Sequence, residues 1–267
     1  MRGARALTAG VVCALAVTMA PSQAVAAGPG PAASSVAPAR SSQAGERARP
    51  AVVERRVIGH SRRGRAIIAW RVGDPEAKRK VVLLSTMHGN EPHTRQILYA
   101  LRDGRPIRGV DMWLVPVLNP DGLKRRVRKN AAGVDLNRNY PYAWKRLSGS
   151  YYSGKKPASE PETRALMKFL RRVEPDRLVS FHQPLHGVDT DTKKPGFARR
   201  LARKLGLPRK AFVCGGVCHG TMTGWYNHNF DGAAITVEYG ARPATKTLRG
   251  KAARGLLRAV GARRVAR

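Results

Sequence analysis

An apolar run that ends in polar side chains constrains the fold of this chain more than any other feature. Residues 81–87 read Val-Val-Leu-Leu-Ser-Thr-Met, and His88-Gly89-Asn90-Glu91-Pro92 follows at once. A strand with apolar side chains on both faces is typical of a sheet that helices cover on both sides. The run therefore predicts a buried strand with His88 and Glu91, two accepted zinc ligands, at its carboxyl end.

Apolar patterning along the rest of the chain alternates between strands and helices. Further strands are expected at residues 52–58, 65–72, 110–117, 178–181 and 233–239, and helices at residues 92–101, 161–172, 197–205 and 248–260. This alternation predicts an α/β fold, a mixed, largely parallel central sheet with helices on both faces. Sites in such folds gather at the carboxyl ends of neighbouring strands. We also expect a turn at Asn119-Pro120-Asp121-Gly122.

The N-terminal segment has the pattern of a secretory signal peptide. Arg2 and Arg5 precede an apolar run from Ala9 to Ala20, and a small-residue cleavage site ends at residue 26. Residues 1–26 are therefore predicted to be removed on export, which leaves no transmembrane segment and a secreted or cell-wall-associated protein. Residues 27–50, rich in Ala, Pro and Ser, predict a flexible linker or pro-segment. The folded domain is expected at residues 51–267.

The formal net charge of +33 raises the question of a nucleic-acid ligand. Lys and Arg are scattered over the whole domain, without an aromatic ladder or a recognisable nucleic-acid-binding module. We therefore expect no specific nucleic-acid partner. An exported basic protein would instead meet the anionic polymers of a cell wall, although much of the Arg excess also fits a compositional bias.

Two cysteines remain once the predicted signal peptide, which contains Cys13, is removed. Cys214 and Cys218 are spaced C-x3-C and flank two glycines. In an oxidising compartment this spacing favours a small disulfide loop, and two free thiols are the alternative.

A third candidate metal ligand, His182, follows the apolar run at residues 178–181. On its own, either histidine would also suit an ordinary polar role. A further polar segment reads Asp135-Leu136-Asn137-Arg138-Asn139. In it Arg138, whose guanidinium can donate two parallel hydrogen bonds, lies between two asparagines. Arg138 is well suited to grip a carboxylate, and a structural Asn/Arg turn is the alternative.

Four sequence blocks resemble the M14 zinc carboxypeptidase family, nearest to its bacterial murein peptide amidase-like branch. They read HGNEP at residues 88–92, NPDG at 119–122, GVDLNRN at 133–139 and TVEY at 236–239. They occur in the family's order and span nearly the whole folded domain, and His182 lies between the last two. The resemblance implies a zinc carboxypeptidase-like sandwich and a catalytic domain at residues 51–267.

The resemblance also implies the metal site. His88, Glu91 and His182 would bind one Zn²⁺ ion, the His₂Glu set of carboxypeptidase A, and a water would fill the fourth position. Glu238 would be the general base that deprotonates this water. A surface carboxylate on a strand is the alternative for Glu238.

The resemblance assigns the remaining roles to three polar residues. Arg128 would stabilise the developing oxyanion. The alternative is that Arg128 only belongs to a solvent-exposed basic face. Asn137 and Arg138 would bind the terminal carboxylate of the substrate. The sequence departs from digestive-type members, which carry a mobile tyrosine in the region that here spans residues 214–221, because no Tyr occurs there. Tyr226 lies nearby but is not assigned that role.

These expectations describe a secreted zinc metallocarboxypeptidase that hydrolyses peptide or amide bonds next to a free carboxylate by zinc-activated water. Peptides are the expected substrates, and muropeptides, the stem peptides of peptidoglycan, are candidates among them. Two alternatives stay open. One is an N-acyl amino acid deacylase on the same scaffold, and the other is a non-catalytic cell-wall-binding protein.

Overall fold

A single mixed sheet of eight strands organises the computed structural model of the protein, which describes residues 51–213 and 215–266. Its strands are β1 (Val52–His60), β2 (Ala66–Gly73), β3 (Lys80–Ser85), β5 (Asp111–Val115), β6 (Arg177–His182), β7 (Gly187–Asp189), β8 (Arg209–Lys210) and β9 (Ala233–Glu238). Their order across the sheet is β1-β2-β5-β3-β6-β9-β7-β8. A separate pair consists of β4 (Ile107–Arg108) and β10 (Arg263–Arg264).

The four central strands, β5, β3, β6 and β9, run parallel to one another. Antiparallel pairs flank them, because β2 runs against both β1 and β5, and β7 runs against β9. The predicted mixed, largely parallel sheet is confirmed. Since β3, β6 and β9 are parallel neighbours, their carboxyl ends meet at one edge of the sheet.

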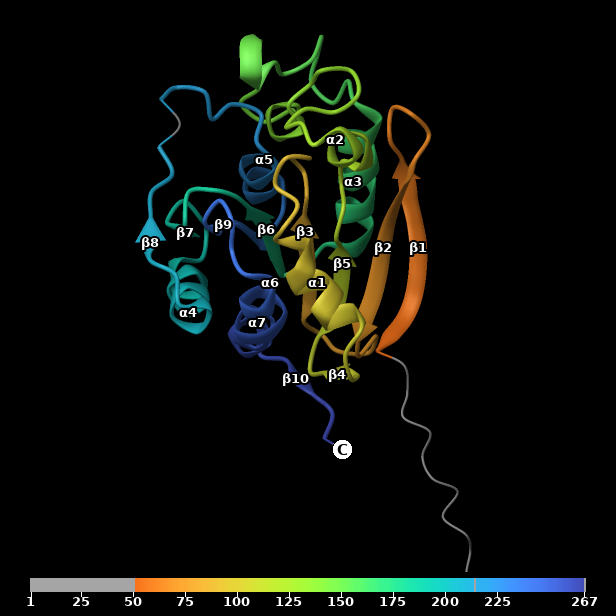
Figure 1. Ribbon diagram of the computed structural model, residues 1–267, viewed down its shortest axis with the longest axis vertical. Helices are drawn as coiled ribbons and strands as arrows, with labels where there is room; N and C mark the ends of the chain where they lie inside the picture. The colour runs from red at the N-terminus through yellow and green to blue at the C-terminus, as the bar shows by residue number, and fades with distance from the viewer. Residues whose placement is uncertain (1–50, 214, 267) are drawn as a thin grey trace, which may run out of the picture. The chain divides into compact units, whose positions relative to one another are not determined.

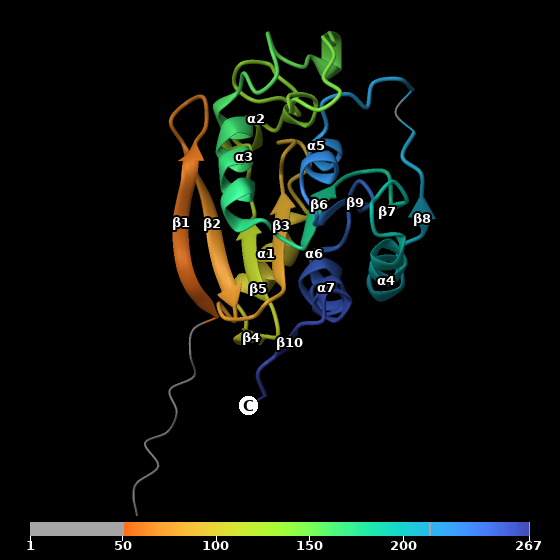
Figure 2. The same ribbon diagram turned by 180° about the vertical axis from the view of Figure 1, so that it is seen from behind.

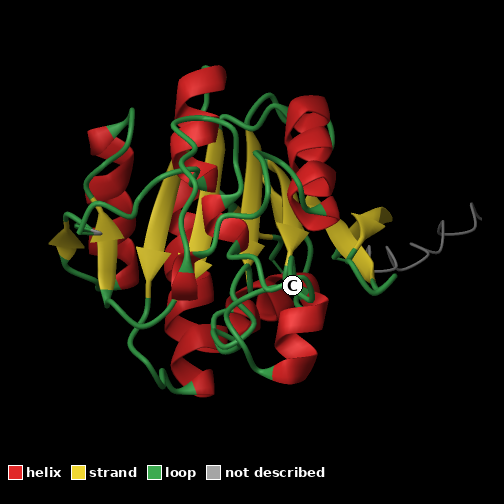
Figure 3. Ribbon diagram, turned by 90° about the horizontal axis from the view of Figure 1, so that it is seen from above, coloured by secondary structure: helices red, strands yellow, loops and turns green. Residues whose placement is uncertain are grey.

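Helices cover both faces of this sheet (Figures 1, 2 and 3). The helices are α1 (Arg95–Arg102), α2 (Pro120–Arg125), α3 (Pro161–Val173), α4 (Pro195–Leu205), α5 (Met222–Asn229), α6 (Thr245–Thr247) and α7 (Ala253–Val260). Two 3₁₀ turns, η1 (Leu136–Arg138) and η2 (Gly149–Tyr151), and a π-helical turn, η3 (Leu248–Ala252), complete the set. Helices α1, α4 and α7 lie in front of the sheet in Figure 1, and α3 and α5 lie in front in Figure 2.

Alternate side chains of β3 supply the two halves of the core. Val81 and Leu83 pack in the cluster that α1, α4 and α7 cover, whereas Val82 and Leu84 pack in the cluster beneath α3 and α5. All four are fully buried. Burial of each such side chain contributes about 1.5–3 kcal/mol, so β3 is anchored from both sides. This anchoring explains why a continuous apolar run precedes the polar segment.

Two local expectations differ from the structure. Helix α1 begins at Arg95 rather than at Pro92, because the segment before it is occupied by polar contacts, including the bond from the His93 N–H to Gln183 Oε1 at 3.0 Å. The expected turn at residues 119–122 is instead the start of α2. Asn119 Oδ1 accepts from the Gly122 N–H at 2.8 Å, and Pro120 takes the first helical position.

The predicted signal peptide at residues 1–26 and the linker at 27–50 lie outside the described residues, as does Cys214. Cys218 is disulfide-bonded, which agrees with the predicted disulfide, although the pairing with Cys214 stays a prediction. No helix within the described ranges combines the length and the apolar content that a membrane span needs.

Candidate active site

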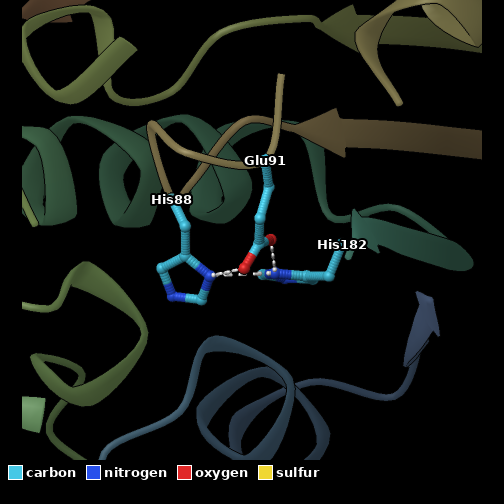
Figure 4. A group of neighbouring side chains, drawn as sticks. All are labelled: His88, Glu91 and His182. Carbon is cyan, nitrogen blue, oxygen red and sulfur yellow. Dashed lines mark hydrogen bonds and ion pairs between the residues drawn. The ribbon is translucent and has the colours of Figure 1, made fainter. Parts of the chain in front are cut away.

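Three candidate metal ligands converge at the carboxyl edge of the sheet (Figure 4). His88 and Glu91 lie in the loop that follows β3, and His182 is the last residue of β6. Glu91 Oε1 lies 2.7 Å from His88 Nδ1, and Glu91 Oε2 lies 2.9 Å from His182 Nδ1. One ligand atom from each residue lies within 4.8 Å of the others, and all three side chains are at most 5% exposed.

Two of the sequence blocks hold the ligand loop in place by packing against each other. A Cβ atom on Gly89 would lie 2.0 Å from the backbone carbon of Gly122, so only glycine allows this approach. Asn119 Nδ2 donates to Met87 O at 3.2 Å and to Arg128 O at 3.3 Å. The start of α2 therefore supports the ligand loop and ties it to the segment that carries Arg128.

Each histidine ring has a hydrogen-bond partner on its Nε2 atom, and this partner orients the ring so that its Nδ1 atom faces Glu91. His88 Nε2 lies 3.1 Å from Asp135 Oδ1, and His182 Nε2 lies 2.8 Å from Ser180 Oγ. This arrangement leaves the Nδ1 atoms of both rings, 3.3 Å apart, facing the carboxylate. Outer partners of this kind orient metal-binding histidines. Two nitrogens and a carboxylate are a donor set that zinc accepts, so these residues fit one zinc ion.

Charge attraction holds this cluster together. Burial lowers the pKa of His88, but the charges of Glu91 and Asp135 outweigh it and raise the pKa to about 9. Burial raises the pKa of Glu91, yet the neighbouring His88 and His182 hold it well below the usual range. Asp135 behaves in the same way, since His88 and Arg128 more than offset its burial and lower its pKa. Both carboxylates are therefore ionised at neutral pH.

Arg128 is the basic residue of its run that reaches the ligand cluster. Its Nε donates to Asp135 Oδ2 at 2.9 Å, and its Nη1 lies 3.5 Å from Glu91 Oε1. Lys124, Arg125 and Arg126 are exposed instead. The structure thus places the guanidinium of Arg128 beside the three candidate ligands.

Glu238 lies at the end of β9, directly opposite His182 in the strand pairing. It is buried, and its Oε2 accepts from the Leu185 N–H at 3.2 Å. Burial raises the pKa of Glu238, and the charge of His182 partly offsets the rise. This carboxylate faces the same cavity as the three ligands, so it is not a surface side chain.

Asn137 and Arg138 lie on η1, whose first turn Asp135 caps by accepting from the Asn137 N–H at 2.9 Å. Asn137 Oδ1 accepts from the Met222 N–H at 2.9 Å and so joins η1 to α5. Arg138 is 5% exposed, and burial lowers its pKa. Its Nε has no hydrogen-bond partner among the described residues. A buried guanidinium with an unpartnered N–H suits a ligand carboxylate.

One cavity of about 580 Å³ unites all seven predicted site residues. This volume lies in the range of small-molecule sites. Its lining also includes Asp189, at the end of β7, and residues from the segments 211–213 and 217–221. Asp231 and Tyr226 do not line it, and the Tyr226 hydroxyl instead donates to Pro175 O at 2.6 Å.

Sequence reasoning did not identify three contributors to this site. Asp135 and Ser180 orient the candidate ligands, and Tyr151 lines the cavity with its ring 5.4 Å from the Arg128 guanidinium. Asp135 lies in the sequence block at residues 133–139, so the sequence alone could have indicated a role for it in the site. Ser180 and Tyr151 have no comparable sequence signal, because their roles depend on contacts between distant segments.

Comparison with known proteins gives consistent matches. The sequence model of the zinc carboxypeptidase family (Peptidase_M14) matches residues 41–188. Murein peptide amidase A of Escherichia coli K12 is 35% identical over 159 residues, which cover 54% of this chain and 64% of that relative. The chain therefore spans less than two thirds of that relative's length.

Solved structures give matches of the same kind. Murein-tripeptide amidase MpaA from Escherichia coli O157 superposes with a TM-score of 0.64 at 30% identity, covering 77% of this chain and 92% of that one. Carboxypeptidase A from Helicoverpa armigera shares the fold, with a TM-score of 0.66 at 19% identity and coverage of 79% and 69%.

Proposed function

This chain belongs to the zinc carboxypeptidase family, and we propose that it is a secreted zinc metallopeptidase acting next to a free carboxylate. The bond hydrolysed is a peptide or amide bond, and the substrates are stem peptides of peptidoglycan. One observation carries the proposal: a buried His88–Glu91–His182 cluster shares a cavity with Arg138, whose Nε lacks a partner among the described residues.

The metal-binding residues in this proposal are His88, Glu91 and His182. A zinc ion held by them would act as a Lewis acid and lower the pKa of a water molecule. Asp135 and Ser180 keep both imidazole rings oriented toward Glu91, so the donor atoms need little rearrangement.

The remaining site residues bind the substrate and move protons. Asn137 and Arg138 hold the free carboxylate and so orient the neighbouring bond. Glu238 accepts a proton from the attacking water and passes it to the leaving amine, and its raised pKa suits both transfers. Arg128 donates to the carbonyl oxygen as negative charge develops on it.

Support for the peptidoglycan substrate comes from the relatives named murein peptide amidase A and from MpaA. Support for export comes from the signal-peptide pattern at residues 1–26. The strong positive charge suits attachment to anionic cell-wall polymers. Cell fractionation tests the location, and the expected mature chain begins at residue 27.

Metal analysis combined with a product screen tests the activity. Purified protein is expected to contain one zinc per chain and to release products from peptides or muropeptides that end in a free carboxylate, as read by mass spectrometry. Glu238→Gln should keep the zinc and lose hydrolysis, whereas Glu174→Gln, an exposed change outside the cavity, should alter neither. Absence of stoichiometric zinc, or full activity of Glu238→Gln, contradicts the proposal. Turnover of N-acyl amino acids alone would favour the deacylase.

A further inference from the structure

Tyr151 brings an aromatic ring to the two arginines of the candidate active site. The centre of the ring lies 5.4 Å from the guanidinium carbon of Arg128 and 5.2 Å from that of Arg138. Both distances are within the range at which a cation is attracted to the face of an aromatic ring. Tyr151 lines the main cavity of about 580 Å³ together with both arginines, and it is 39% exposed.

The two arginines repel each other, because each carries a positive charge. Burial is the main cause of the lowered pKa of Arg138, Asp135 partly offsets it, and the charge of Arg128 lowers it further. Arg128 Nε donates to Asp135 Oδ2 at 2.9 Å. Arg138 Nη1 donates to Asn137 O at 2.7 Å, and its Nε has no partner among the described residues. The Tyr151 ring supplies an attraction for both guanidinium groups that opposes this repulsion.

Tyr151 is held in this position by the chain segment that carries the two arginines. Lys129 Nζ donates to Gly149 O at 2.5 Å, at the start of η2. The Asp135 N–H donates to Tyr152 O at 2.8 Å, directly after Tyr151. Residues on both sides of the tyrosine are thus bonded to the segment between the two arginines. These bonds fix the backbone of η2 relative to both guanidinium groups.

Loss of the ring would have two separable consequences in the proposed function. Arg138 binds the terminal carboxylate of the substrate, so a less well positioned Arg138 weakens binding and raises KM. Arg128 donates to the carbonyl oxygen only as charge develops on it, so a less well positioned Arg128 lowers kcat.

We propose that Tyr151 is a positioning residue, whose ring holds the guanidinium groups of Arg128 and Arg138 in the orientation that substrate binding and hydrolysis require. The preference for a free terminal carboxylate over a neutral terminal amide then depends on the aromatic ring at position 151 and not on its hydroxyl group. The inference rests on the proposed function. It adds a residue that acts through the two arginines rather than through the candidate metal ligands.

Two peptides that differ only in a free or an amidated carboxyl terminus test this proposal with zinc-loaded protein. The wild type should prefer the free acid in kcat/KM. Tyr151→Leu should lower this preference about twofold to fivefold, the factor that corresponds to a cation–π contact at an exposed site. It should also raise KM for the free acid and lower kcat for both peptides, with zinc content unchanged. Tyr151→Phe keeps the ring and should match the wild type.

A double variant shows whether Tyr151 acts through Arg138. The preference for the free acid that remains in Arg138→Gln should be the same in Arg138→Gln/Tyr151→Leu, because the ring then has no guanidinium to position at residue 138. A further loss of this preference in the double variant overturns the inference.

Tyr142→Leu is the matched control. Tyr142 lines the same cavity and is 42% exposed, but its ring stacks on His228 at 4.1 Å between ring centres. This variant should retain the wild-type preference for the free acid. The inference is overturned if Tyr151→Leu matches the wild type, if Tyr151→Phe is as impaired as Tyr151→Leu, or if Tyr142→Leu loses the preference to the same extent. Equal cleavage of both peptides by the wild type would instead count against the proposed function.

Discussion

The ligand cluster and the far rim of the main cavity are built in opposite ways. His88, Glu91 and His182 are at most 5% exposed; the first two lie in the loop that follows β3, and His182 is the last residue of β6. On the rim, Leu185 is 52% exposed and Val213 is 89% exposed. The candidate metal ligands thus lie in or directly after buried strands, whereas this part of the rim lies on exposed loops, where a protein can vary its ligand contacts without disturbing the scaffold.

This difference in burial predicts which substitutions should have large effects and which should have small ones. A change in the ligand cluster disturbs several buried charges at once, because each member has more than one partner. A change at the rim removes contacts that solvent can replace. We therefore expect a descending series of effects from the cluster to the rim.

The largest effect is expected for His182→Ala. Loss of one of three candidate ligands should remove stoichiometric zinc and reduce hydrolysis by more than about 100-fold, the upper range for changes to residues that only orient metal ligands. His93→Ala, a partly exposed histidine outside the cluster, serves as the control and should keep the metal. Metal analysis and steady-state kinetics measure both. If His182→Ala kept stoichiometric zinc, the His88–Glu91–His182 cluster would not be the metal site.

Zinc removal should come next. Binding to the folded chain alone stabilises it by about 2.7 kcal/mol when free metal is 100-fold above Kd. Treatment with a chelator should therefore lower Tm, and added zinc should restore it. The His182→Ala variant should show no such recovery. An unchanged Tm in the wild type would mean that the cluster does not couple metal binding to folding.

Asp135→Asn should have an intermediate effect. The change keeps the side-chain shape but removes the charge that faces His88 and Arg128. Zinc affinity is expected to fall about 10-fold to 100-fold, as measured by competition with a metal-binding dye. Asp231→Asn changes an exposed carboxylate outside the cavity and should match the wild type.

The smallest effect on the fold is expected at the rim. Val213→Ser should leave zinc content unchanged and shift the free energy of unfolding by no more than about 0.5 kcal/mol. Its kcat/KM should change by different factors for peptides with large and small terminal residues. Val53→Ser, an exposed change on β1, is the control and should not alter this preference. A loss of zinc in Val213→Ser would show that the rim of the cavity contributes to metal binding by the cluster.

Much of the fold was predictable because its signals are local. The run at residues 81–87 already shows a strand buried on both faces, since neighbouring side chains alternate between the two halves of the core. The start of α1 was not predictable in this way. Its first turn is displaced to Arg95 because Glu91 and His93 bond to segments about 90 residues away.

The seven predicted site residues share one cavity, but their roles stay predictions until tested. Residue chemistry and position singled out His88, Glu91, His182 and Arg138, and the resemblance to the family implied the roles of all seven. The Asp135 contact, the Ser180 contact and the position of Tyr151 were missed, although Asp135 stood in a recognised block. Tyr226 lies near residues 214–221 in the sequence, yet its hydroxyl donates to Pro175 O and it does not line the cavity.

The sequence by itself determined the α/β layering, the family and the residue types available for the chemistry, because periodicity and short motifs depend on neighbours in the chain. Only the tertiary structure decided how those residues meet. His88 and His182 are 94 positions apart, and their Nδ1 atoms lie 3.3 Å from each other. The tertiary structure also decided that all seven predicted site residues line one cavity, because a cavity is the space that several distant segments leave between them.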